Sequence, residues 1–215
     1  LEFQHTFRAA RDHRFVWGAE ARLDRITGGN YFFSTKETHD QRLYRLFAND
    51  EWRFAKNWTA NLGAMYEDND ISDGEISPRL AINHVFSPEH SWRAAYSRAW
   101  RTPSLLEHDG SGLICATPPL IPCIATIRGN PSIESERIDS YEIGYRGSFA
   151  DRALSVDIRI YHEKIDGLIS IVDDVGVAAF VNNGGVHVDG WETQLDWRPR
   201  PGTRLVLAHA YTRQH

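Results

Sequence analysis

Hydrophobic and polar positions alternate along much of the chain. From Phe15 to Arg25 the odd positions are mostly apolar, and several of the even positions are charged. Residues 58–67 and 154–161 repeat this alternation. Because successive side chains on a strand point to opposite faces, each segment predicts a strand with one apolar face and one polar face.

About ten such segments can be counted, most of them roughly ten residues long, which is enough to cross a bilayer at a tilt. Strands of soluble proteins are usually about five or six residues long. We expect strands near residues 1–9, 14–25, 42–54, 58–67, 76–86, 91–101, 137–147, 154–162, 186–198 and 203–212.

The connections alternate between short turns and long loops. Short turns are expected near residues 10–13, 55–57, 87–90, 148–151 and 199–202, and long loops near 26–41, 67–75, 102–136 and 163–185. This asymmetry is the plan of an outer-membrane β-barrel. The sequence therefore predicts an all-β fold, an antiparallel up-and-down transmembrane β-barrel segment of about ten strands with short periplasmic turns and long extracellular loops.

Aromatic residues gather beside the expected short turns, where an apolar ring with a polar edge suits the headgroup level of a membrane. The alternative is that these rings fill the core of a soluble β-sandwich. Strand length and loop asymmetry favour the barrel. The residues concerned are Phe7, Phe15, Trp52, Phe54, Trp58, Phe86, Trp92, Phe149 and Trp197.

Composition agrees with a barrel whose interior is wet. The 215 residues carry a formal net charge of −5 and a mean hydropathy of −0.46. No apolar run approaches the roughly 20 residues of a transmembrane helix, and a polar lumen accounts for the modest hydropathy. Lys and Arg are scattered and form no basic stripe, so no nucleic-acid partner is expected.

The chain reads as one domain, residues 1–215, that is part of a larger barrel. It begins at Leu1 rather than at Met and shows no signal peptide. An open sheet would have two edges with unpaired backbone groups. We expect these edges to pair with further barrel strands, to close on each other or to pair with a second copy.

The two cysteines lie in the longest expected loop. Cys115 and Cys123 enclose a short segment that contains three prolines. In an oxidising compartment they are expected to form a disulfide that stiffens the loop. The alternatives are two reduced thiols or half of a metal site, although the spacing is not that of a zinc knuckle.

No catalytic signature is present. The chain lacks G-x-S-x-G, P-loop and G-x-G-x-x-G motifs, and His162-Glu163 has no second His to complete H-E-x-x-H. We therefore expect no enzyme activity, no catalytic residue, no metal site and no cofactor. Charged residues of the strands are interpreted as facing the barrel lumen, namely Glu20, Glu142, Glu192, Arg22, Arg79 and Arg146.

A series of short motifs resembles the TonB-dependent outer-membrane receptors. The segment 93–107, with Arg-Thr-Pro at 101–103, is similar to the family's strand-to-loop motif, and it is followed by Gly-Asn-Pro at 129–131 and Tyr-Glu-Ile-Gly-Tyr at 141–145. Asn-Asn-Gly-Gly at 182–185 and Gly-Trp-Glu at 190–192 match later elements in the same order. The residues that match the motifs are Arg101, Pro103, Glu107, Asn130, Pro131, Glu136, Glu142, Gly144, Gly190 and Glu192.

The resemblance implies active uptake. Such receptors have a plugged barrel of roughly 22 strands, sit in the lipid of the bacterial outer membrane, and capture a scarce ligand, commonly a ferric siderophore. An inner-membrane complex acts through TonB on the plug, and the plug is absent from this chain. A passive porin or adhesin-type barrel and a soluble β-sandwich binding module remain as alternatives.

Two kinds of ligand contact are expected. His108 lies between the Arg101 and Asn130 motifs, and this position resembles that of the loop histidine in receptors that take up haem. Neutral imidazole is a good axial ligand for haem iron. Trp100 and Thr102 depart from the family's haem motif. For a ferric siderophore, the expected contacts are Arg128, Tyr31, Phe32 and Phe33. Another iron chelate, or a vitamin, a sugar or another nutrient, remains as an alternative ligand.

Overall fold

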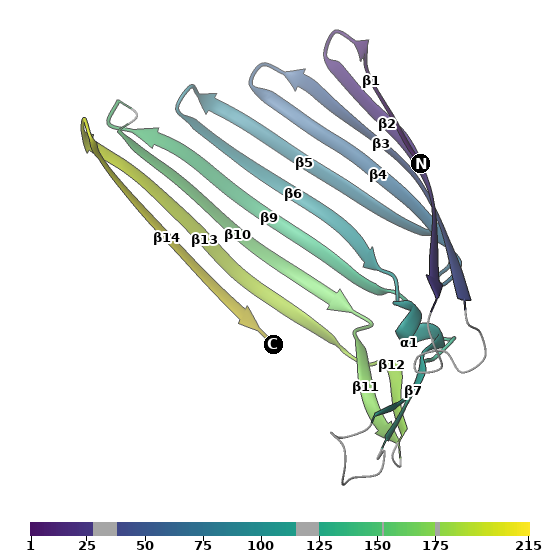
Figure 1. Ribbon diagram of the computed structural model, residues 1–215. Coiled ribbons are helices and arrows are strands. Elements are labelled where there is room, and N and C mark those ends of the chain that lie inside the picture. The colour runs from purple at the N-terminus through teal and green to yellow at the C-terminus, as the bar shows by residue number, and fades with distance from the viewer. Residues whose placement is uncertain (28–37, 115–124, 152, 175–176) are drawn as a thin grey trace.

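The computed structural model describes residues 1–27, 38–114, 125–151, 153–174 and 177–215. Ten long strands form one sheet in the order β1-β2-β3-β4-β5-β6-β9-β10-β13-β14, and every neighbouring pair is antiparallel (Figure 1). Their bounds are Glu2–Ala10 (β1), His13–Thr27 (β2), Thr38–Ala55 (β3), Trp58–Asn69 (β4), Glu75–Ser87 (β5), His90–Arg101 (β6), Glu136–Phe149 (β9), Leu154–Asp166 (β10), Gly185–Arg200 (β13) and Thr203–Gln214 (β14).

The sequence-based strands are confirmed, and so is the alternation of short and long connections. Four of the five short turns hold two residues between their strands. Three of the five contain residues with positive φ, which are Asn57 (67°), Ala150 (51°), Asp151 (53°) and Gly202 (80°). Positive φ is typical of tight hairpin turns because it lets the turn match the twist of the strands. All the short turns lie at one end of the sheet in Figure 1, and the long connections lie at the other.

The two faces of the sheet differ as the alternation predicts. One face presents large apolar side chains to the outside, including Leu46, Ile143 and Ile160, which are 56%, 64% and 59% exposed. The opposite face carries charged rows such as Glu20, Arg45 and Glu67, whose side chains are 13–31% exposed. Side chains converge on the inside of a curved sheet, so we assign the less exposed polar face to the concave side.

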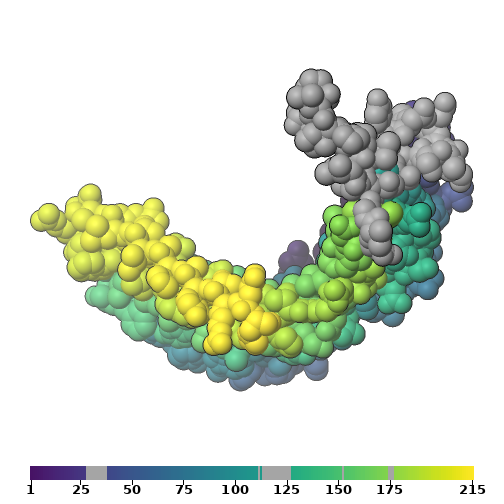
Figure 2. All heavy atoms as spheres, turned by 90° about the horizontal axis from the view of Figure 1, so that it is seen from below, coloured from purple at the N-terminus to yellow at the C-terminus, as the bar shows by residue number. Residues whose placement is uncertain are grey.

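The sheet is curved into a trough and does not close within this chain (Figure 2). Its two edges are β1 and β14, at opposite ends of the strand order. No helix of the described residues is long and apolar enough to cross a membrane.

Aromatic rings form a connected band beside the short turns from β3 to β9. His84 stacks on Trp58 with ring centroids 4.0 Å apart, and Trp92 packs edge-on against Trp58 at 5.6 Å. On β4, Trp58 lies eight residues from Tyr66 on the same face, about 26 Å along the strand. That separation is comparable to the apolar band of an outer-membrane barrel, about 25 Å tall.

The long connections contain structure that the alternation did not predict. After β6 come a short helix, α1 (Leu105–Asp109), and the strands β7 (Ser111–Ile114) and β8 (Ala125–Arg128). After β10 come β11 (Ile169–Asp174) and β12 (Val177–Asn182). These strands form a second sheet in the order β11-β12-β8-β7, in which β12 and β8 are parallel. The two long connections therefore share one sheet beyond the loop ends of the long strands (Figure 1).

Candidate functional site at the loop ends of the strands

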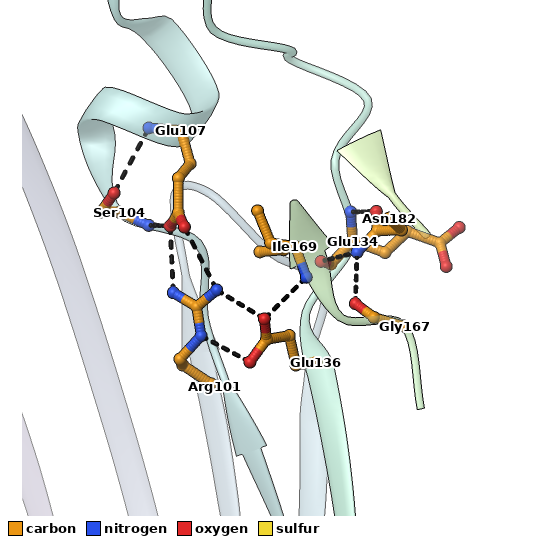
Figure 3. Close-up of polar contacts among 8 residues, drawn as sticks. All are labelled: Arg101, Ser104, Glu107, Glu134, Glu136, Gly167, Ile169 and Asn182. Carbon is orange, nitrogen blue, oxygen red and sulfur yellow. Dashed lines mark hydrogen bonds and ion pairs between the residues drawn. The ribbon is translucent and has the colours of Figure 1, made fainter. Parts of the chain in front are cut away.

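Arg101 joins two carboxylates at the point where the long strands end. It is the last residue of β6, and it faces Glu136, the first residue of β9. The guanidinium donates to both oxygens of Glu136, with Nε to Oε2 at 2.7 Å and Nη2 to Oε1 at 2.8 Å. It also donates to both oxygens of Glu107, at 3.1 and 3.2 Å (Figure 3). One planar cation thus holds two anions in a fixed geometry.

Glu107 fixes the start of α1. Its Oε2 accepts from the backbone N–H of Ser104 at 2.7 Å, while the Ser104 hydroxyl oxygen accepts from the backbone N–H of Glu107 at 3.3 Å (Figure 3). This is a capping box, which satisfies backbone donors that a helix start leaves unpaired. Pro103, just before it, is fully buried. The side chain of Glu107 therefore caps the helix and anchors it to the end of β6.

Glu136 reaches the other long connection. Its Oε1 accepts from the backbone N–H of Ile169, the first residue of β11, at 2.7 Å. Asn182 adds three hydrogen bonds nearby: its amide donates to the carbonyls of Glu134 and Gly167 at 2.9 and 2.8 Å, and its Oδ1 accepts from the Glu134 N–H at 2.7 Å (Figure 3). These contacts connect the segment before β9 to both ends of the β11–β12 hairpin.

Asn130 makes a second connection between the two loops. Its amide donates to the carbonyl of Phe180 in β12 at 3.1 Å, and its backbone N–H donates to the carbonyl of Glu107 at 2.8 Å. The Asn130 Oδ1 also accepts from the N–H of Ser132 at 3.0 Å, which forms a local turn. Pro131, the next motif residue, lies in that turn and is exposed. We call Arg101, Glu107, Asn130, Glu136 and Asn182 the loop clamp.

Electrostatics favour the charged state of the clamp. The hydrogen bonds from Arg101 hold the pKa of Glu136 below its usual range, against the opposing effect of partial burial. Burial raises the pKa of Glu107, but the hydrogen bonds from Arg101 and Ser104 together outweigh it and the net shift is downward. Hydrogen bonds to Glu136 and Glu107 raise the pKa of Arg101. All three groups are ionised at neutral pH.

The two remaining motif carboxylates, Glu142 and Glu192, belong to a charged row on the concave face. Arg93 lies 2.8 Å from Glu142, and Arg159 bridges Glu142 at 3.2 Å and Glu192 at 3.0 Å. This row crosses β6, β9, β10 and β13, and it bears out the lumen-facing interpretation of Glu142 and Glu192. Alternating charges of this kind line a polar lumen rather than form an acid–base pair.

The motif glycines make room for this packing. A Cβ on Gly144 would lie 2.9 Å from Nε of Arg93. A Cβ on Gly190 would lie 2.4 Å from the ring of Tyr161 and 2.8 Å from the carbonyl oxygen of Tyr211. All three contacts are too short for a carbon atom, so these glycines allow a close approach of neighbouring side chains and, at Gly190, of a backbone carbonyl.

Only some of the residues expected to contact a ligand are among the described residues. Arg128 is exposed at the end of β8, and no ion pair is formed by it within the described residues. His108 lies in α1 with its side chain 17% exposed, and its Nδ1 is 2.9 Å from Oδ1 of Asp109. Tyr31, Phe32 and Phe33 lie outside the described residues, as do Cys115 and Cys123. The disulfide therefore stays a prediction.

The whole chain matches one protein family. A family model described as TonB dependent receptor-like, beta-barrel, matches residues 1–215. The chain belongs to this family. Its members and the solved structures of the same fold are transport receptors rather than enzymes.

Solved receptors share the architecture at low sequence identity. The siderophore receptor PirA from Pseudomonas aeruginosa superposes with a TM-score of 0.82 at 14% identity, over 99% of this chain and 39% of that one. A mutant of the ferric enterobactin receptor PfeA from the same organism gives 0.81 at 15%, over 98% and 34%. The FrpB iron transporter from Neisseria meningitidis gives 0.72 at 14%, over 99% and 35%. The receptor chain described here thus spans less than two fifths of these proteins.

The clamp explains part of the motif set in physical terms. Arg101, Glu107, Asn130 and Glu136 were selected from the sequence, and the structure brings them together. Arg159, Ile169 and the role of Asn182 were not anticipated. Asn182 stands in the Asn-Asn-Gly-Gly segment, and an amide before two glycines is a signal for a turn held by side-chain hydrogen bonds.

Proposed function

We propose that this chain is part of a receptor that captures a ferric siderophore outside the cell for TonB-driven uptake. The observation that carries the proposal is the loop clamp, together with the sheet β11-β12-β8-β7 that it supports. Binding loops on a rigid scaffold are a common arrangement for recognition, and ordering a loop before binding reduces the entropic cost of capture.

The proposed ligand class rests on charge and on the solved structures. PirA is described as a siderophore receptor and PfeA as a ferric enterobactin receptor, one structure of which is in complex with enterobactin. Ferric siderophores are bulky and often anionic. The exposed cation of Arg128 and the aromatic residues Tyr31, Phe32 and Phe33 match such a ligand.

Haem has less support than a siderophore. The Nδ1 of His108 is close to the carboxylate of its neighbour Asp109, and the side chain is largely covered. The contact at Nδ1 leaves Nε2 open as a ligand, but a haem could reach it only by displacing the groups that cover this side chain. We therefore assign His108 to the packing of α1.

The proposed setting is the outer membrane. The exposed apolar face would contact lipid, and residues 1–215 would supply one part of a single barrel domain whose further strands pair with β1 and β14. TonB would act through a plug region that this chain does not include. The short turns would face the periplasm, and the clamp would face the outside.

Iron-limited growth tests this proposal. A strain that lacks the receptor gene should fail to grow on a single ferric siderophore and should recover with the wild-type gene. Uptake of radioactive iron should stop when the proton-motive force is removed. Uptake that continues without it would favour the porin alternative.

A variant then tests the assigned site. Arg128→Ala should weaken binding of the anionic complex, whereas Arg11→Ala, a cation in a short turn at the opposite end of the sheet, should leave it unchanged. Equal binding by both variants would remove Arg128 from the site.

A further inference from the structure

The connection between β12 and β13 contains an asparagine that is followed directly by a glycine. Asn183 is the only asparagine of the sequence whose next residue is glycine. Asn183 and Gly184 lie between the end of β12 and the start of β13, and both are exposed. At such a step the backbone nitrogen of the glycine can attack the preceding side-chain amide, because glycine places no Cβ in the way.

Gly184 leaves the attacking nitrogen accessible. Its φ is 77°, and a Cβ at this position would meet no heavy atom of the described residues within 4 Å. Its backbone N–H donates to no carbonyl oxygen among the described residues. The nitrogen that would attack Asn183 is therefore neither covered by neighbouring atoms nor held by a carbonyl.

The neighbouring Asn182 is protected from the same reaction. Its side-chain amide donates to the carbonyls of Glu134 and Gly167 at 2.9 and 2.8 Å (Figure 3). The nitrogen that would attack it belongs to Asn183, whose N–H donates to the carbonyl of Leu168 at 2.7 Å. Of the two attacking nitrogens in this segment, one is held and the other is not.

We infer that Asn183 is a modification site, at which the side-chain amide is lost without an enzyme. The backbone nitrogen of Gly184 gives up its proton, attacks Cγ of Asn183 and closes a five-membered ring. The side-chain nitrogen takes up one proton and leaves as ammonia. Water then opens the ring at one of its two carbonyls, which yields aspartate or isoaspartate. One water is consumed for each ammonia released, and the attack is favoured because both groups belong to one chain segment.

Isoaspartate would lengthen the main chain at the base of the β11–β12 hairpin. In this product the chain runs through Cβ and Cγ of residue 183, which adds one carbon atom, about 1.5 Å of bond. The Asn183 N–H on one side of the added atom donates to Leu168. The Gly184 carbonyl on the other side accepts from the N–H groups of Gly167 and Leu168 at 3.1 and 3.3 Å. Both sets of hydrogen bonds cannot keep their geometry, so the connection opens beside Asn182 of the loop clamp.

Both products also place a new carboxylate at the loop ends of the strands. It would lie next to Asn182, which holds Glu134 in the clamp. A negative charge beside a binding surface opposes an anionic ligand. Modification should therefore weaken capture of an anionic ferric siderophore, a consequence that rests on the proposed function. The reaction would lower the activity of the receptor as the protein ages.

Peptide mass spectrometry of the complete receptor tests the inference. The receptor is kept folded in detergent near neutral pH for several days and is then digested. Residue 183 should gain about 1 Da, the change from an amide to an acid, and residue 182 should not. The gain should form faster at higher pH, because the attacking nitrogen has to lose its proton. Fragmentation that separates isoaspartate from aspartate should find both products.

A variant and an unfolded sample are the controls. Asn183→Gln keeps an amide in place but would need a less favourable six-membered ring, so its mass should stay constant. In urea-unfolded receptor the fold no longer affects either asparagine. A folded receptor that keeps its mass while the unfolded one gains at residue 183 would overturn the inference, because the fold would then protect Asn183. Equal gains at residues 182 and 183 in the folded receptor would overturn it as well.

Hydrogen exchange tests the opening of the connection. The amides of Gly167 and Leu168 should exchange faster in aged wild type than in fresh protein, and aged Asn183→Gln should show no such change. Asn183→Asp carries the new charge without the extra carbon atom, so it should exchange as fresh wild type does. Unchanged exchange in a receptor rich in isoaspartate would overturn the release of the clamp.

Neither measurement uses a ligand, which separates this inference from the proposed function. Modification at residue 183 in a receptor that binds no siderophore would support the inference and defeat the proposed ligand. Normal siderophore uptake by a receptor that stays unmodified would defeat the inference and leave the receptor function standing.

Discussion

Arg101 and Glu136 face each other in the last pair of the β6–β9 ladder, and the guanidinium donates to both carboxylate oxygens at 2.7 and 2.8 Å. The same carboxylate accepts from the first backbone N–H of β11. One side-chain pair at the end of two barrel strands thus positions two loops that are far apart in the sequence.

Removing Arg101 should loosen both loops together. Arg101→Ala leaves Glu107 and Glu136 without their shared cation, and we expect a local destabilisation of about 1–2 kcal/mol, reduced by the partial exposure of the pair. Hydrogen exchange should speed up in α1 and in β11. Arg25→Ala is the control, since Arg25 makes a similar bidentate pair with Asp40 that links only β2 to β3. Faster exchange in only one of the two loops would show that the clamp does not couple them.

The clamp should weaken in acid. The folded pKa values of Glu107 and Glu136 are lowered, so their contribution is fully present above the unfolded value, about 4.3, and is lost as pH falls through the lower folded values. Loop protection measured by hydrogen exchange, corrected for the intrinsic rate, should therefore be constant from pH 7 to about pH 5 and decline below about pH 4.3. Arg101→Ala should abolish most of this dependence, and an unchanged acid profile in that variant would contradict the assignment.

Gly190 should tolerate no larger residue. A Cβ there meets Tyr161 at 2.4 Å and a backbone oxygen at 2.8 Å, so Gly190→Ala should destabilise the barrel by about 1–3 kcal/mol, as overpacking usually does. Thermal unfolding in detergent measures this loss. Adding Tyr161→Ala removes the ring contact but not the carbonyl contact, so the double variant should recover only part of the stability.

The predicted disulfide can be tested without affecting the barrel. Cys115→Ser with Cys123→Ser should leave assembly intact and weaken siderophore binding through a looser loop. A ring this short contributes on the order of 2–3 kcal/mol at most. Thiol titration of the unfolded wild type should find no free thiol before reduction. Loss of the assembled barrel in the double variant would mean that the pair supports the strands instead.

The orientation can be checked by labelling single cysteines in that same double-serine background. A cysteine at Ser132, beside the clamp, should react with an impermeant maleimide on intact cells. A cysteine at Lys56, in the short turn between β3 and β4, should react only after the outer membrane is opened. The reverse pattern would invert the proposed topology.

The sequence by itself determined the ten long strands, their order and their two faces. Strand periodicity is local, so Phe15–Arg25 or Leu154–Tyr161 can be interpreted without knowing the partner strand. Short turns also force neighbouring strands to pair, which leaves an up-and-down sheet as the simplest topology. The lumen-facing positions of Glu142 and Glu192 followed from the same alternation.

Only the tertiary structure decided how the loops are joined. The β12–β8 pair brings together residues about 50 positions apart, such as Val177 and Thr126, and no local periodicity specifies such a contact. The sequence marked Arg101, Glu107 and Glu136 as motif residues but not as one clamp, because a side-chain hydrogen bond depends on where three separate backbones end.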